Sequence, residues 1–88
     1  MTLKIQKARR DYSAVVFMLS GRIEMIHIVE LQRLFDLEDS DVVLDLHDVQ
    51  LVDRAAVAFL ERWEANGVTL DGCPAYLREW IEKERTSR

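Results

Sequence analysis

Cysteine, basic charge and long apolar runs are all scarce in this sequence. Cys73 is the single cysteine among 88 residues, so an internal disulfide cannot form. Lys and Arg number 12 against 16 Asp and Glu, and the resulting net charge of −4 disfavours general binding to a phosphate backbone. The N-terminus has no apolar core of the kind that a signal peptide or a membrane span needs. We therefore expect a cytoplasmic protein with no nucleic-acid partner and no direct membrane insertion.

Hydroxyl side chains are missing from the middle of the chain. No Ser, Thr or Tyr lies between Ser40 and Thr69. Phosphoryl transfer to such a side chain needs a nucleophilic oxygen, and this stretch offers none of that type.

Hydrophobic residues are plentiful by contrast, at 49% of the sequence. A chain of this length and composition can bury a modest core without covalent cross-links. We find no internal repeat, linker or low-complexity tract, and we expect a single domain over residues 1–88.

Two apolar patterns near the N-terminus predict a β-hairpin. Leu3 and Ile5 alternate with polar residues, the period-two pattern of a strand with one exposed face. Residues 14–19 are apolar on both faces, which predicts a central strand. We expect Ser20 and Gly21 to end that strand.

A helix and then a buried strand are predicted next. The apolar spacing from about Glu24 becomes that of one helical face, formed by Ile28, Leu31, Leu34 and Phe35. His27 lies at the fringe of this stripe, and it is either a titrating switch or a surface histidine. Residues 42–46 are β-branched or Leu with a single carboxylate, which indicates a short buried strand followed by a loop.

Asp53 stands immediately before an Ala-rich segment with helical spacing. A short carboxylate in this place can accept hydrogen bonds from the first helical turn, so we expect Asp53 to be the N-cap. The predicted buried seam of this helix consists of Ala56, Leu60 and Trp63. We expect Glu61 and Glu64 to face water, and Gly67 to follow the end of the helix.

The C-terminal part predicts a short strand and a third helix. Residues 68–70 are the strand candidate, and Pro74 lies near the start of the helix, where its missing N–H is tolerated. We expect this helix to bury Leu77, Trp80 and Ile81.

The predicted order is strand, strand, helix, strand, helix, strand, helix, an α/β arrangement with α+β character. Residues 19–23, residues 43–46 followed by 49–60, and residues 67–70 followed by Cys73 and Pro74 resemble the STAS domain, named for sulphate transporters and anti-sigma-factor antagonists. The resemblance covers nearly the whole chain. It implies a mixed sheet of about four strands packed against about three helices.

The same resemblance implies a protein-interaction switch rather than an enzyme. In the antagonist branch of the family, an Asp at the loop-to-helix junction is followed by Ser-Ser-Gly, and the anti-sigma factor, which is also a kinase, phosphorylates the second serine. The matching positions here are residues 53–56, and the acceptor position is Ala55, which has no hydroxyl. The charge of about −1.5 to −2 that a phosphoserine adds therefore cannot arise at this position.

The resemblance also implies a docking surface around the junction. We assign it to Asp48, Gln50, Asp53, Arg54, Ala55 and Ala58. The expected partner is an anti-sigma factor, a kinase or a larger regulatory assembly in bacterial-type signal transduction and transcription regulation, and a homodimer stays open. The alternative function is a sensor of a nucleotide or another anion.

The alternative sensor would hold its ligand at Ser20, Gly21 and Arg54. Arg54 occupies the first helical turn, where a cation lies against the positive end of the helix dipole and gains nothing locally. Contact with a partner, an exposed arginine paired with a nearby carboxylate, and a phosphate site all stay open for this residue.

Catalytic readings find less support in the sequence. Asp45 and His47 share a face if both lie on a strand, which would suit a base with its orienting acid or two metal ligands. A nucleophile and a third ligand are not evident, so we favour structural roles, with Asp48 in a turn. Cys73 is either a reactive thiol at a helix start or a packed side chain. We expect no enzyme activity, no metal and no cofactor.

Overall fold

The computed structural model describes residues 3–87 and contains a four-stranded mixed sheet with three helices. The elements are β1 (Lys4–Arg9), β2 (Ala14–Ile23), α1 (Met25–Asp36), β3 (Asp41–Val52), α2 (Arg54–Ala65), β4 (Thr69–Asp71) and α3 (Ala75–Thr86). The strands follow the order β1-β2-β3-β4, with β1 antiparallel to β2 and the other pairs parallel. The predicted α/β class and the predicted order of elements are confirmed.

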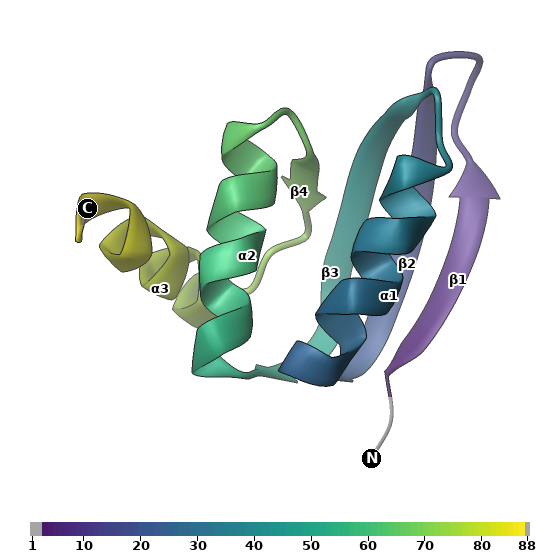
Figure 1. The fold of residues 1–88 in the computed structure, drawn as a ribbon. Helices are drawn as coiled ribbons and strands as arrows, with labels where there is room; N and C mark the ends of the chain where they lie inside the picture. The colour runs from purple at the N-terminus through teal and green to yellow at the C-terminus, as the bar shows by residue number, and fades with distance from the viewer. Residues whose placement is uncertain (1–2, 88) are drawn as a thin grey trace.

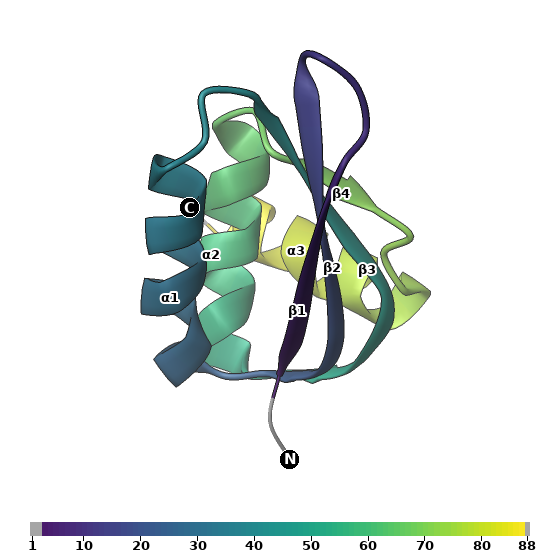
Figure 2. The same ribbon diagram turned by 90° about the vertical axis from the view of Figure 1, so that its right-hand side faces the viewer.

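Helices α1 and α2 cover the same face of the sheet and begin at the same end of the molecule (Figures 1 and 2). Each helix connects two adjacent parallel strands, and both connections step in the same direction across the sheet. Because such crossovers are right-handed, both helices must lie on one face. Helix α3 packs against α2 at the β4 edge of the sheet.

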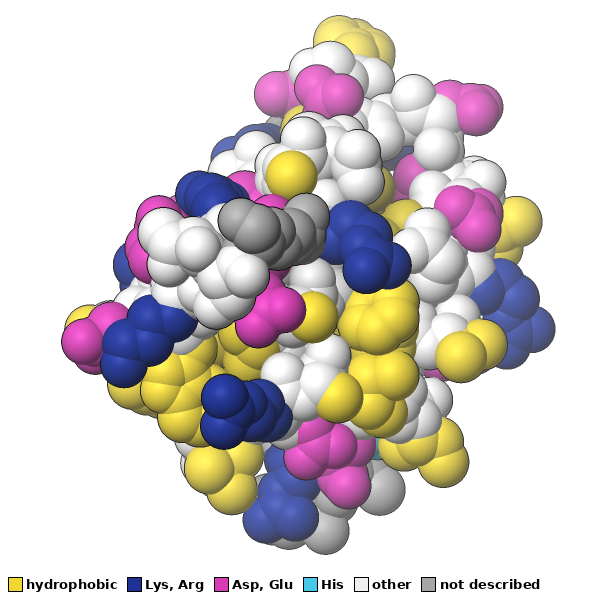
Figure 3. Space-filling model, turned by 60° about the vertical axis from the view of Figure 1, so that its left-hand side comes forward, with side chains coloured by type: hydrophobic (Ala, Val, Ile, Leu, Met, Phe, Trp, Pro, Cys, Tyr) yellow, Lys and Arg dark blue, Asp and Glu magenta, His cyan; other side chains and the backbone are white. Residues whose placement is uncertain are grey.

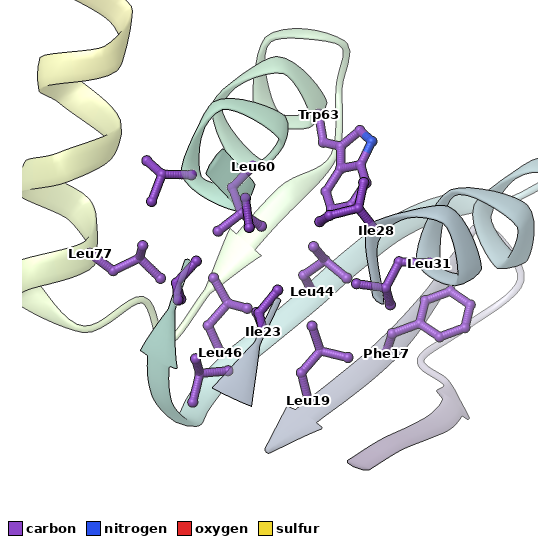
Figure 4. Packing of buried hydrophobic residues seen from close by; sticks show 14 of the residues in the cluster. Phe17, Leu19, Ile23, Ile28, Leu31, Leu44, Leu46, Leu60, Trp63 and Leu77 are labelled. Atoms are coloured by element: carbon purple, nitrogen blue, oxygen red, sulfur yellow. The ribbon is translucent and has the colours of Figure 1, made fainter. Parts of the chain in front are cut away.

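The core lies between this sheet face and the three helices (Figure 4). Leu44 on β3 and Leu60 on α2 are both fully buried, as is Leu77 on α3. Trp63 is buried as predicted, and its ring meets the ring of Phe35 edge to face with centroids 4.9 Å apart. These contacts tie α1, α2 and α3 to the central strands.

Strands β2 and β3 are longer than the sequence predicts. Strand β2 continues through the expected break at Ser20 and Gly21, and β3 continues through the expected loop. Asp48 therefore lies in a strand, pairing with Ser20, and its predicted place in a turn is wrong. Two register shifts in the β2–β3 pairing give β3 extra residues, and these bulges interrupt the alternation by which a strand is recognised.

Helix α3 changes the environment of two residues. The prediction that Trp80 is buried is wrong, because the residue is 43% exposed while Leu77 and Ile81 fill the contact with α2. The prediction that Glu61 faces water is also wrong, since it is only 2% exposed. Helix α2 packs against both the sheet and α3. Its buried stripe is therefore wider than that of a helix that packs against the sheet alone.

Candidate functional site

The predicted docking surface lies where β3 meets α2. Asp53 stands between the two elements, and Asp53, Arg54 and Ala55 are exposed, whereas Ala56 is fully buried. The methyl group of Ala55 therefore reaches the surface in the first turn of α2. Ala58, one turn further on, is half-buried.

Asp53 occupies the N-cap position of α2, as predicted, but its carboxylate does not cap that helix. Its Oδ2 accepts a hydrogen bond from the backbone N–H of Met25, the first residue of α1, at 3.2 Å. Its own N–H donates to the carbonyl of Ile23 at 2.8 Å. Because α1 and α2 begin side by side, Asp53 links the N-terminal ends of the two helices.

His27 also accepts a hydrogen bond at the N-terminal end of α1. Its Nδ1 accepts a hydrogen bond from the backbone N–H of Glu24 at 3.0 Å, which satisfies a second donor at the start of α1. Asp53 and His27 thus engage the N–H groups of Met25 and Glu24. These two groups are not available to an anion, and His27 has a structural role in addition to its place on the helix.

An apolar seam runs between α1 and α2 above this entrance. Trp63 Nε1 donates to Gln32 Oε1 at 2.7 Å, which fixes the sides of the two helices that face each other. Going one and two turns back toward the N-termini, the same sides carry Val29 and Met25 on α1, and Phe59 and Ala55 on α2. We call these four residues, together with the neighbouring Ile26 and Ala58, the entrance surface.

The entrance surface is unusually apolar for an exposed helix pair. Ile26 and Val29 are 79% and 73% exposed, and Met25 is 38% exposed. Single exposed apolar side chains are common, but a cluster on adjoining helices is typical of an interaction site. None of the six residues carries a charge.

Arg54 points away from this seam, toward α3. It lines a hollow of about 250 Å³ between α2 and α3, with Val57, Trp80, Lys83, Glu84 and Ser87. Pockets for small molecules usually measure about 300 to 1,000 Å³. Ser20 and Gly21 are not among the lining residues and instead pair with Asp48 and Val49 in the sheet. The hollow and the predicted ligand residues on β2 are therefore separate features.

Gln50 and Asp48 lie on the exposed part of β3. The carbonyl of Gln50 accepts a hydrogen bond from the Tyr76 hydroxyl at 3.0 Å, which fixes the start of α3 against β3. The predicted docking residues are thus divided, with Asp53 and Ala55 beside α1, and Gln50 and Arg54 beside α3.

Asp45 and His47 do not form the pair that a catalytic reading would need. Asp45 Oδ1 accepts the backbone N–H of His47 at 3.0 Å, and the His47 ring instead lies 3.3 Å from Asp48 Oδ1. Both His47 and Asp48 are well exposed. Burial raises the pKa of the Cys73 thiol, which disfavours the reactive thiolate.

An ion-pair network holds α3 against α2. Arg78 donates two hydrogen bonds to the carboxylate of Glu64, each of 2.9 Å, and Arg85 Nη2 lies 2.7 Å from Glu64 Oε1. The hydrogen bonds from Arg78 lower the pKa of Glu64 below its ordinary value. This network fixes α3 beside α2 and so shapes the hollow next to Arg54.

The sequence reasoning missed Met25, Ile26 and Val29 on α1, and Trp80 and Lys83 on α3. A signal for the first group was available, because Ile26 and Val29 fall outside the buried stripe of their helix and have no place in its core. No comparable signal marks Trp80, whose spacing from Leu77 also suits a buried position.

Across residues 3–87, no three His, Cys, Asp or Glu side chains gather closely enough to hold a metal ion. The same part of the chain contains no helix of the length and hydropathy that a membrane crossing requires. No protein-family model and no curated protein matches this chain.

Proposed function

We propose that this chain is a non-catalytic interaction module of the STAS type that docks a protein partner on the entrance surface. The observation that carries the proposal is the exposed apolar seam formed by α1 and α2 at their N-terminal ends, with Ile26 and Val29 the most exposed of its side chains. One charge that lies against it is the guanidinium of Arg62, which lies over the Phe59 ring, 5.2 Å from the ring centroid. The partner is an anti-sigma factor, a kinase or a regulatory assembly of a cytoplasmic signalling pathway that controls transcription.

The absence of a modifiable hydroxyl gives the module a specific regulatory character. Ala55 stands in the exposed first turn of α2, and residues 41–68 contain no Ser, Thr or Tyr. A phosphoserine cannot therefore introduce negative charge at this part of the docking surface. The module is constitutively competent to bind, and control is exerted through its abundance or through its partner.

A small-ligand sensor is less well supported by the geometry. Asp53 and His27 occupy two N–H groups at the α1 entrance, and the hollow beside Arg54 is smaller than ordinary ligand pockets. Ser20 and Gly21 do not line that hollow. These observations favour a protein partner over a nucleotide or another anion.

The substitution Ala55→Glu tests the proposal because it should move binding and stability in opposite directions. A carboxylate buried without a partner in an interface weakens binding, and we expect at least about a tenfold loss of affinity. In the free protein, the same carboxylate lies at the positive end of the α2 dipole and should leave stability unchanged or raise it by about 0.3 to 1 kcal/mol. The partner is first identified by affinity purification from the source cell, and binding is then measured with purified proteins by calorimetry.

The matched control is Ala65→Glu, which adds the same charge at the exposed opposite end of α2. It should leave the affinity unchanged. Equal affinity of the partner for the wild-type chain and for Ala55→Glu would contradict docking on the entrance surface. Stoichiometric phosphate on residues 41–68 after incubation with the partner and ATP would contradict the constitutive character.

A further inference from the structure

The hollow between α2 and α3 has a composition that the entrance surface lacks. Its walls carry two cations and one large aromatic ring, supplied by Arg54 on α2 and by Lys83 and Trp80 on α3. Figure 3 brings the α3 side of the molecule forward and shows hydrophobic side chains on this side with Lys or Arg side chains beside them. We call this feature the α2–α3 groove.

The two cations of the groove form no ion pair with any of the described residues 3–87. Within residues 3–87, no carboxylate lies within ion-pair distance of Arg54 or Lys83, although Arg78 and Arg85 on the same helix pair are fully engaged. Arg54 also lies at the positive end of the α2 dipole, where a cation is unfavourable. In a chain whose net charge is −4, two unpaired cations beside one groove are a local excess of positive charge.

The aromatic ring of the groove is exposed but held in place. Trp80 is 43% exposed, and its ring packs edge to face against Tyr76 with centroids 6.1 Å apart. Tyr76 is itself fixed by its hydrogen bond to the carbonyl of Gln50. Trp and Arg are the side chains that most often dominate binding energy in protein interfaces, and a ring that is already ordered loses little entropy on binding.

We propose that the α2–α3 groove binds an acidic segment of a protein partner, with carboxylates at Arg54 and Lys83 and an apolar side chain on Trp80. The inference rests on the proposed function and adds the chemistry of the segment that the partner presents. Among the described residues of the lining, Glu84 is the only acidic one, and it would repel a multiply charged phosphate more than a spaced pair of carboxylates. The open, small hollow also suits a chain segment better than an enclosed ligand.

A titration followed by NMR tests the inference directly. The probe is a short blocked peptide of Asp and Glu with one central Leu, and its neutral counterpart has Asn and Gln in place of the acids. We expect the acidic peptide to shift the indole N–H resonance of Trp80 and the amides around Arg54 and Lys83, and added salt to weaken the effect. The neutral peptide should bind at least about tenfold more weakly.

Charge-changing variants locate the binding site. Lys83→Glu should weaken binding of the acidic peptide at least about tenfold, and the milder Lys83→Gln should weaken it less, while both keep the amide spectrum of a folded chain. Lys4→Glu is the matched control, because it makes the same charge change at an exposed position on β1. Equal weakening by Lys4→Glu and Lys83→Glu would show nonspecific attraction and overturn the inference.

Other outcomes separate the inference from the proposed function. In one outcome, the indole N–H resonance of Trp80 shifts with ATP or inorganic phosphate but not with the acidic peptide. That result would contradict the inference and indicate that the groove binds a small anion. In another, a purified partner loses affinity for Ala55→Glu but keeps it for Lys83→Glu and Trp80→Ala. That result would support docking on the entrance surface and contradict the proposed role of the α2–α3 groove. Loss of affinity for all three variants, with the peptide shifts at Trp80, supports both.

Discussion

At the scale of single residues, Asp53 shows how one side chain can serve two elements. It occupies the N-cap position of α2, yet its carboxylate accepts its hydrogen bond from the first N–H of α1. Its backbone N–H donates to the last residue of β2. The residue therefore fixes the relative position of the two helices that form the entrance surface.

We expect Asp53→Ala to lower the free energy of unfolding by about 1 kcal/mol, within the range of roughly 0.5 to 2 kcal/mol seen for lost helix caps. Asp53→Asn keeps a side-chain oxygen and should cost less. Urea unfolding followed by circular dichroism measures both. Asp39→Ala removes an exposed carboxylate outside the helices and should have little effect. If Asp39→Ala lowered the free energy of unfolding as much as Asp53→Ala, the bridging role of Asp53 would be contradicted.

At the scale of elements, α3 is attached to α2 by apolar contacts and by charge. Leu77 and Ile81 are fully buried against the core. At the margin of that contact, the carboxylate of Glu64 accepts hydrogen bonds from Arg78 and Arg85. The attachment has a functional consequence, because Arg54 and Trp80 form one groove only while α3 stays in place.

The attachment should weaken in acid. The pKa of Glu64 is lowered in the folded chain, chiefly by its hydrogen bonds with Arg78, from an ordinary value of 4.5. Its contribution is therefore complete above that ordinary value and is lost as the pH falls through the lowered folded pKa. Urea unfolding at a series of pH values should show a shallower loss of stability in acid for Glu64→Gln than for the wild type.

At neutral pH, Glu64→Gln should itself be less stable by about 1 kcal/mol, since the pair is partly exposed and screened. Glu79→Gln is the matched control on the exposed side of α3, and at neutral pH it should leave the free energy of unfolding unchanged. If the free energy of unfolding fell equally steeply in acid for Glu64→Gln and the wild type, the ion pair would contribute no stability.

At the scale of the whole molecule, one core supports every surface described above. Leu44 lies on a central strand at the middle of this core, and its side chain is fully buried beneath α1 and α2 (Figure 4). Domains of this size have total stabilities of roughly 5 to 15 kcal/mol. A single cavity at this place therefore removes a large fraction of the stability.

We expect Leu44→Ala to cost about 2 to 5 kcal/mol, through lost apolar burial and the cavity that remains. Thermal unfolding should show a large fall in Tm, and binding at both the entrance surface and the α2–α3 groove should weaken in parallel. Leu37→Ala, at a position that is 75% exposed, should leave both unchanged. A stable Leu44→Ala variant that has lost binding would contradict a purely structural role for this residue.

The order of the elements and most of the core follow from the sequence alone, because they depend on local periodicity. The apolar run at residues 14–19 predicts β2 as a central strand, and the spacing of Ile28, Leu31 and Phe35 predicts the buried face of α1. The place of Asp53 before the Ala-rich segment likewise marks the start of α2, although its carboxylate accepts its hydrogen bond from α1 and not from α2. The missing hydroxyls of residues 41–68 are a property of composition and need no coordinates.

The tertiary structure alone decided which surfaces these elements share. The bulges of β3 arise from its pairing with β2, and the burial of Glu61 and the exposure of Trp80 both depend on where α3 packs. The carboxylate of Asp53 reaches Met25 only because two right-handed crossovers place both helix entrances side by side. Periodicity reports how one segment divides its faces, whereas contacts between segments distant in the chain are fixed by packing, and both proposed docking surfaces are made of such contacts.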